Sequence, residues 1–132
     1  LKRFIILCTR IAREKFSVSP EREKAFDMVR QFYVLVDNHF KEKKMVQDYA
    51  NMLHRSPKTL SNLFTTCGLP SPLRIIHERI EAEAKRLLLY SQKSAKEITE
   101  ILGFEDQATF SRFFKKMTGE SVSEYRKREK QE

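Results

Sequence analysis

The amino-acid sequence predicts an all-α protein, and three observations support that fold class. Of its 132 residues only 3 are glycine and 4 are proline, and the helix-favouring residues Glu, Lys, Leu and Ala occur throughout. No stretch shows the apolar–polar alternation of a strand. Serine or aspartate residues that can cap a helix recur before segments with apolar residues at helical spacing. We therefore expect two helix-turn-helix subdomains joined by a long linker helix and preceded by an N-terminal helical hairpin.

Residues 1–40 are expected to form the helical hairpin. In residues 1–15, apolar side chains share one face and five basic residues surround them, which predicts an amphipathic helix of about four turns. Ser19, Pro20 and Glu21 then provide a cap, a first-turn proline and an acid that suits the helix dipole. A basic amphipathic helix can also lie on a membrane, but a wide apolar face beside a second helix favours packing within the protein.

Residues 45–71 predict the first helix-turn-helix unit. A short helix covers Val46–Leu53, and Ser56 followed by Pro57 starts the second helix of the pair. Gly68 ends that helix, because glycine adopts the left-handed conformation that often follows a helix.

A long linker helix is predicted over residues 72–91. Ser71 caps its start, Pro72 suits its first turn, and its apolar pattern continues to about Tyr90. At 1.5 Å per residue, nearly twenty residues span roughly 28 Å. The apolar residues expected to face inward are Leu73, Ile76, Ile80, Ala84, Leu87 and Leu88.

Residues 94–131 predict the second helix-turn-helix unit. Ser94 and Glu97 have capping-box spacing, Gly103 stands where the first helix should end, and Asp106 can cap the next helix. The expected inward face of that helix carries Phe110, Phe113 and Phe114. Its opposite face carries Gln107, Ser111, Arg112, Lys115 and Lys116. These are side-chain types that read base edges or contact phosphates in a DNA major groove.

Matching residues in the two units indicate an internal duplication. Positions that recur fifty residues later are Leu60 and Phe110, Ser61 and Ser111, Leu63 and Phe113, Phe64 and Phe114, and Ser71 and Ser121. Tyr49 and Leu53 recur forty-nine residues later as Ile98 and Leu102, so the second turn is one residue longer. Ala50 and Thr99 are small where the two helices of each unit must cross. Two such units on one stiff helix can lie in successive major grooves, about 34 Å apart.

Charge favours a polyanionic partner. Lys and Arg exceed Asp and Glu by 8, and the isoelectric point is about 9.6. The apolar run near the start is too short to span a membrane, and no signal peptide is visible. Because the sequence begins with Leu1 rather than Met, we expect it to be a fragment of a longer protein.

Catalytic and metal-binding chemistry is not indicated. Cys8 and Cys67 do not form a metal-binding pair and are interpreted as reduced, structural thiols of a cytoplasmic protein. His39, His54 and His77 have no ligand-like spacing and are interpreted as surface or packing residues. Since no nucleophile–base pair or glycine-rich phosphate loop is readable, we expect no enzyme, cofactor or metal.

The stretch from about Val46 to Arg126 resembles the DNA-binding domain of AraC/XylS-family transcriptional regulators. Matching positions in the first part include Ala50, Leu53, Ser56, Leu60, Phe64, Gly68, Ser71, Pro72, Arg79, Ala84, Leu87 and Leu88. The most specific part comprises Gly103, Phe104, Phe110 through Lys116, Gly119, Tyr125 and Arg126. The resemblance implies a bacterial, nucleoid-associated cytoplasmic regulator that binds double-stranded promoter DNA. Such a regulator acts on transcription, usually by recruiting RNA polymerase.

On this resemblance the chain divides into residues 1–44, the connecting and dimerisation helices, and residues 45–132, the tandem DNA-binding domain. A homodimer through residues 1–40 would explain the wide apolar face of residues 1–15. Many family members carry a ligand-sensing or dimerisation domain upstream, and we expect that domain to be absent from this sequence.

Twelve residues are the predicted DNA contacts. The base-edge candidates are Lys58, Thr59, Ser61, Asn62, Gln107, Ala108, Ser111 and Arg112. The phosphate candidates are Arg55, Ser56, Lys115 and Lys116. Alternatives stay open: the first unit's polar face can be merely solvated, and Arg112 can contact a phosphate or pair with Glu105 or Asp106. Lys115 and Lys116 can simply complement a helix C-terminus.

The sequence departs from the family pattern at two places. Asn62 and Thr65 stand where basic residues are frequent, although asparagine can bind adenine bidentately. Val122 stands where proline is common, but Ser121 and Glu124 still offer a capping box. A helical protein-interaction module without nucleic-acid binding is the alternative function.

Overall fold

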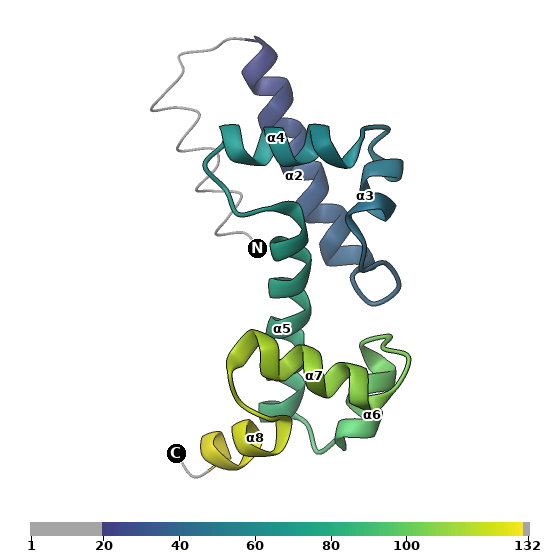
Figure 1. Ribbon diagram of the computed structural model, residues 1–132, viewed down its shortest axis with the longest axis vertical. Helices are drawn as coiled ribbons and strands as arrows, with labels where there is room; N and C mark the ends of the chain where they lie inside the picture. Colours follow the sequence, from purple (N-terminus) through teal and green to yellow (C-terminus); the bar gives the residue numbers. More distant parts are fainter. Residues whose placement is uncertain (1–19, 131–132) are drawn as a thin grey trace. The chain divides into compact units, whose positions relative to one another are not determined.

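The computed structural model describes residues 20–130, in which helices joined by short turns and loops occur and no strand is present (Figure 1). The predicted helix within residues 1–15 lies outside the described residues. The helices are α2 (Pro20–His39), α3 (Val46–Met52), α4 (Pro57–Thr66), α5 (Pro72–Tyr90), α6 (Ala95–Ile101), α7 (Gln107–Thr118) and α8 (Val122–Lys130). The predicted all-α class is thus confirmed. The chain divides into two compact units, one ending at Ile76 and the other beginning at His77.

The first unit is built on aromatic side chains of α2. The Phe32 ring lies 4.9 Å from the Phe64 ring of α4 and 5.5 Å from the Tyr49 ring of α3, measured between centroids. Further buried residues of this unit are Phe26, Val29, Tyr33, Val36, Phe40, Ala50, Leu53, Leu60, Cys67, Ile75 and Ile76. α2 therefore contributes to the core beneath the first helix-turn-helix.

The second unit packs α6, α7 and α8 with the greater part of α5. The Phe114 ring of α7 meets the Tyr125 ring of α8 edge-on, with centroids 5.4 Å apart. Further buried residues are Ile80, Glu83, Ala84, Leu87, Leu88, Ile98, Thr99, Leu102, Phe110 and Val122. Phe113, which was expected to face inward, is only half-buried, and Phe104 is half-buried as well.

α2 and α5 each lead into a helix-turn-helix with a similar pattern of burial. The buried positions of α2 include Val29, Phe32, Tyr33 and Val36. Fifty-one positions later in each case, α5 buries Ile80, Glu83, Ala84 and Leu87. Each unit thus consists of a leading helix followed by a helix-turn-helix. The start of α5 closes the first unit as α8 closes the second: Ser71 and Ser121 cap these helices, and Ile75 and Tyr125 are buried at corresponding positions.

The predicted helix starts are confirmed by side-chain caps. Ser56 accepts a hydrogen bond from the Thr59 N–H at 3.1 Å, and Asp106 accepts one from the Thr109 N–H at 2.7 Å. Ser94 and Glu97 form the full capping box, with bonds of 3.0 and 3.1 Å. A second box joins Ser121 and Glu124, so α8 starts as expected although Val122 replaces the common proline.

The turn of each helix-turn-helix uses a residue in the left-handed conformation. Gly103 has φ 79° in the second unit, as predicted, whereas His54 has φ 56° in the first. Both turns close in the same way. The Arg55 N–H donates to the Ala50 carbonyl at 2.9 Å, and the corresponding bond in the second unit joins Phe104 to Thr99 at 3.1 Å. His54 is the non-glycine residue with positive φ in the described part of the chain.

The prediction of an inward-facing residue in α5 is wrong at one position, Leu73. Leu73 was expected to face inward, but it is 44% exposed, while Ile75 is 4% exposed. Helical periodicity specifies which face of a helix is apolar, but not how far along the helix other elements cover that face. The remaining predicted inward positions of α5 are buried.

Candidate nucleic-acid interface

α4 presents a polar face to solvent. Leu60 and Phe64 are fully buried and hold the helix against its own unit. The outward side chains that were predicted as DNA contacts, namely Lys58, Thr59, Ser61 and Asn62, are all exposed. An α-helix with an apolar back and a polar front of this kind can enter a major groove.

Several hydroxyl groups of α4 are engaged within the helix. The Thr59 hydroxyl shares a hydrogen bond of 2.9 Å with the Ser56 hydroxyl, which also caps the helix. The Thr65 and Thr66 hydroxyls donate to carbonyls one turn earlier, at 3.0 and 2.9 Å. On the outward face of α4, the side chains of Lys58, Ser61 and Asn62 are exposed and are not engaged in these bonds.

α7 presents the second polar face, which carries more positive charge. Phe110 and Phe114 are fully buried. Ser111 is half-buried, and the other predicted contacts, Gln107, Ala108, Arg112, Lys115 and Lys116, are exposed. Lys115 and Lys116 lie in the last turn of the helix. The exposed cations of α7 can therefore approach a phosphate backbone.

Arg112 makes only a weak contact inside the protein. One of its terminal nitrogens lies 3.4 Å from the Thr109 hydroxyl oxygen, and within the described residues it forms no ion pair with Glu105 or Asp106. The Thr109 N–H holds the pKa of the Asp106 carboxyl below its ordinary value, and the charge of Arg112 contributes to that shift. The guanidinium group is thus exposed and available to an external acceptor.

The turn of the first unit carries Arg55, an exposed residue next to the left-handed His54. One of its terminal nitrogens donates to the His54 carbonyl at 3.0 Å. The corresponding position after the α6 helix is Phe104, whose ring lies 5.4 Å from the rings of Phe110 and Phe113. The first turn therefore offers a cation where the second packs a ring.

His77 lies behind α7 rather than on its polar face. Its ring meets the Phe113 ring edge-on, with centroids 5.2 Å apart. Burial lowers the pKa of the His77 imidazole, and the charge of Lys116 lowers it further. His77 is a packing residue, as expected.

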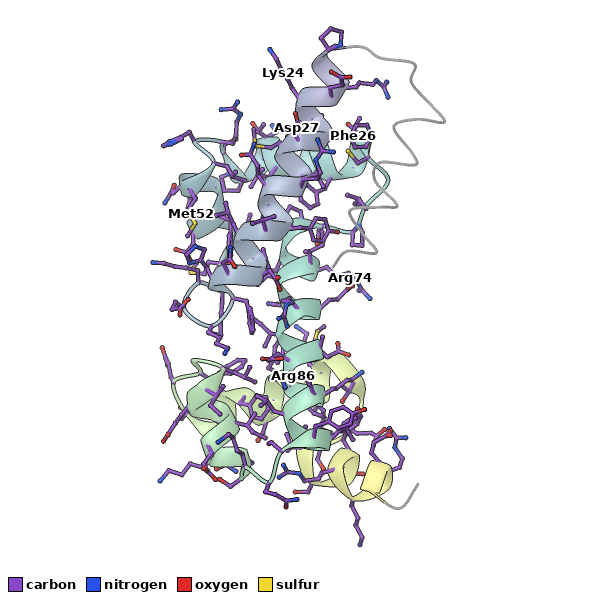
Figure 2. All side chains as sticks on the ribbon, turned by 180° about the vertical axis from the view of Figure 1, so that it is seen from behind. Lys24, Phe26, Asp27, Met52, Arg74 and Arg86 are labelled. Carbon is purple, nitrogen blue, oxygen red and sulfur yellow. The ribbon has the colours of Figure 1, made fainter. Side chains whose placement is uncertain are left out.

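A buried acid on α5 was not singled out from the sequence. Glu83 is buried and accepts two hydrogen bonds from Arg86, at 2.6 and 3.0 Å (Arg86 is labelled in Figure 2). Arg79 approaches the same carboxylate at 4.0 Å. The signal available in the sequence was the spacing of three and four residues between the acid and the two arginines, which places all three side chains on one side of a helix.

Residues 20–130 lack two further features. No group of three His, Cys, Asp or Glu side chains there could hold a metal ion. None of the helices in that range is long and apolar enough to cross a membrane.

Comparison with known proteins bears directly on this pair of polar helices. The family described as "Helix-turn-helix domain" matches residues 49–128. The HTH-type transcriptional regulator YisR of Bacillus subtilis is 30% identical over 122 residues, which are 92% of this chain and 41% of that protein. The arabinose operon regulatory protein of Salmonella typhimurium is 36% identical over 92 residues, which are 70% of this chain and 31% of that protein.

A solved structure has the same fold. The C-terminal domain of AraT, a response regulator from Geobacillus stearothermophilus, matches with a TM-score of 0.68 and 28% identity. The match covers 85% of this chain and 88% of that one.

The fold and the two polar helices define a helix-turn-helix DNA-binding transcription regulator. More particularly, the chain belongs to the AraC/XylS family, which confirms the resemblance found in the sequence and favours DNA binding over the protein-interaction alternative. The chain spans less than half the length of the two regulators above, at 41% and 31%.

Proposed function

We propose that the chain binds promoter DNA sequence-specifically, with α4 and α7 as recognition helices in successive major grooves. The observation that carries this proposal is the repeated arrangement of a fully buried apolar back and an exposed polar front on both helices. The regulator acts on transcription in the bacterial cytoplasm, at the nucleoid, by recruiting RNA polymerase. Membership of the AraC/XylS family supports each of these roles.

Base edges are read mainly by Asn62 in the first unit and Arg112 in the second. An asparagine amide can bind adenine through two hydrogen bonds, and an arginine fork can bind guanine in the same way. Both side chains are exposed. The other base-edge contacts are Lys58, Thr59, Ser61, Gln107, Ala108 and Ser111.

Phosphate groups are contacted by the turn of the first unit and the last turn of α7. Arg55 and Ser56 lie at the start of α4, where a helix dipole favours anions. Lys115 and Lys116 are exposed and form no ion pair within the described residues. Such contacts fix the position of the protein on the duplex without selecting a sequence.

The test begins with selection of binding sites from a pool of random duplexes, because the length of the selected site reports whether both units engage DNA. Arg112→Ala is then expected to abolish preference at particular base pairs, at a cost of about 1–3 kcal/mol at a G·C pair. Lys116→Ala, the control on the same helix, should weaken all duplexes equally and reduce the log–log salt slope by about 0.9.

The contrary results are distinct. If Arg112→Ala weakens all sequences by one factor, Arg112 contacts phosphate and does not read a base. If the wild-type chain shows no preference after selection, the proposed sequence-specific function is wrong.

Dimerisation through residues 1–40 is a further part of the proposal. It is supported by the resemblance of residues 1–40 to the connecting helices of family members, which can carry a dimer contact. Sedimentation of the chain at increasing concentration measures this association directly. A monomer throughout would contradict the proposed dimer and leave the DNA-binding proposal unaffected.

A further inference from the structure

The end of α5 lacks the residue that ends its neighbours. α4, α6 and α7 are each followed by a glycine with positive φ, at Gly68, Gly103 and Gly119. After Tyr90 the chain continues as Ser-Gln-Lys-Ser, without a glycine, before α6 begins. The carbonyl groups in the last turn of a helix have no partner within the helix, so α5 requires a different solution.

A side chain from α8 supplies that solution. The Nε of Arg126 donates to the Leu88 carbonyl at 3.0 Å, and its Nη2 donates to the Ser91 carbonyl at 3.2 Å. Ser91 completes the end by donating to the Leu87 carbonyl, from its N–H at 3.1 Å and from its hydroxyl at 2.6 Å. The guanidinium group suits this task because its donors are held in a rigid plane and can serve two acceptors at once.

We propose that Arg126 is a positioning residue for DNA recognition by the second unit. It fixes the turn between α5 and α6 to α8, and α8 in turn packs on α7 through Tyr125 and Phe114. The helix-turn-helix is thereby held between the two elements that Arg126 joins. This inference rests on the proposed function, since it concerns how α7 is held in place to read DNA.

The first unit has a counterpart made from another residue type. The loop that follows α2 is bound by the Tyr49 hydroxyl of α3, which donates to the Lys43 carbonyl at 2.6 Å. In both units a side chain from another helix therefore holds the segment through which the chain enters the helix-turn-helix. The two contacts come from different positions of the repeat, so each unit holds its entering segment in its own way.

Charge alone does not explain Arg126. Its side chain is half-buried and two of its nitrogens are bonded to backbone carbonyls, whereas the adjacent Lys127 is exposed. Lys127→Ala is therefore a matched control. This substitution removes the same charge as Arg126→Ala, one position away on the same helix, without disturbing the end of α5.

The experiment compares Arg126→Ala, Arg126→Lys and Lys127→Ala in the 132-residue chain, with the selected duplex and a random duplex as probes. Arg126→Ala should lower the ratio of specific to random affinity by about tenfold, because α7 loses its fixed orientation for base contacts while its phosphate contacts remain. Arg126→Lys should restore little of this ratio, because a single ammonium group does not reproduce the fork. Lys127→Ala should leave the ratio unchanged.

A second measurement reports directly on the hydrogen bonds that Arg126 donates to the end of α5. In the DNA-free chain, the Arg126 Nε–H should give an NMR signal that exchanges slowly with solvent and keeps its position when duplex is added. If Arg126→Ala and Lys127→Ala weaken both duplexes by the same factor, or if the Nε–H exchanges rapidly until DNA is added, Arg126 is a phosphate contact and the proposal is overturned.

The two proposals fail in different ways. If the wild-type chain has no sequence preference, the proposed function fails, and the slow Nε–H exchange still reports the cap on α5. If the sequence preference is present but survives Arg126→Ala unchanged, the positioning role fails alone.

Discussion

The two units fill similar helical frameworks with different side chains. In the first unit the leading helix α2 supplies Phe26, Phe32 and Tyr33 to the core, and Phe40 follows directly after the helix. In the second unit the leading helix α5 supplies aliphatic residues and Ala84, and the buried rings come from α7 and α8. Core volume can thus be moved from one helix to another while the backbone plan is kept, as is known for cores in which total volume and patterning are preserved.

The polar faces differ as well. α4 carries one cation, Lys58, and two threonines near its end whose hydroxyls are bonded to their own helix. α7 carries Arg112, Lys115 and Lys116. Since electrostatic attraction to phosphates is independent of sequence, α7 should supply more of the salt-dependent affinity than α4.

The largest expected effect tests whether the aromatic residues of α2 hold the first unit. Phe32→Ala removes a buried ring that contacts Tyr33, Tyr49 and Phe64, and should cost about 3–5 kcal/mol. Amide hydrogen exchange should accelerate more in α3 and α4 than in α6 and α7. Phe114→Ala should give the reverse pattern, and Leu73→Ala, at an exposed apolar position, should change little. Equal acceleration in both units after Phe32→Ala would show that the comparison between separate cores is wrong.

An intermediate effect is expected at the two turns. Gly103→Ala places a side chain at φ 79° and should destabilise the second unit by about 1–2 kcal/mol. His54→Gly removes a side chain from φ 56° and should stabilise the first unit by up to about 1 kcal/mol. Chemical denaturation measures both changes. Destabilisation by His54→Gly would mean that the imidazole makes a compensating interaction in the turn.

The smallest effect concerns pH and only the second unit. Because the pKa of His77 is lowered on folding, the unfolded chain binds more protons below about pH 6.5, and stability falls as the pH decreases through that value. His77→Phe should flatten this dependence between about pH 7.5 and 5.5, as measured by thermal unfolding midpoints. An unchanged pH profile would show that other groups carry it.

The sequence was most informative where structure depends on neighbouring residues. Caps at Ser56, Ser94 and Asp106 and the left-handed Gly103 are local events, and all four were predicted correctly. The exposure of Arg112 also followed from the period of a helix. Local rules suffice here because each bond joins residues only a few positions apart.

Features that depend on distant contacts were missed. The sequence does not reveal that Leu73 is uncovered, because that depends on where the neighbouring elements end. Nor does it reveal that Arg126 binds carbonyls on α5, since 38 residues separate Arg126 from Leu88. The left-handed His54 was missed for another reason: glycine is the usual signal, and the tertiary structure here imposes the conformation on a different residue.

The cap on α5 has a consequence for biosynthesis. A ribosome delivers the Leu88 and Ser91 carbonyls well before the Arg126 guanidinium that binds them. The first unit, whose equivalent bond joins Tyr49 to Lys43, has its counterpart available after only six more residues. A nascent chain that stopped short of Arg126 would contain all of α7 and yet leave α5 without its cap.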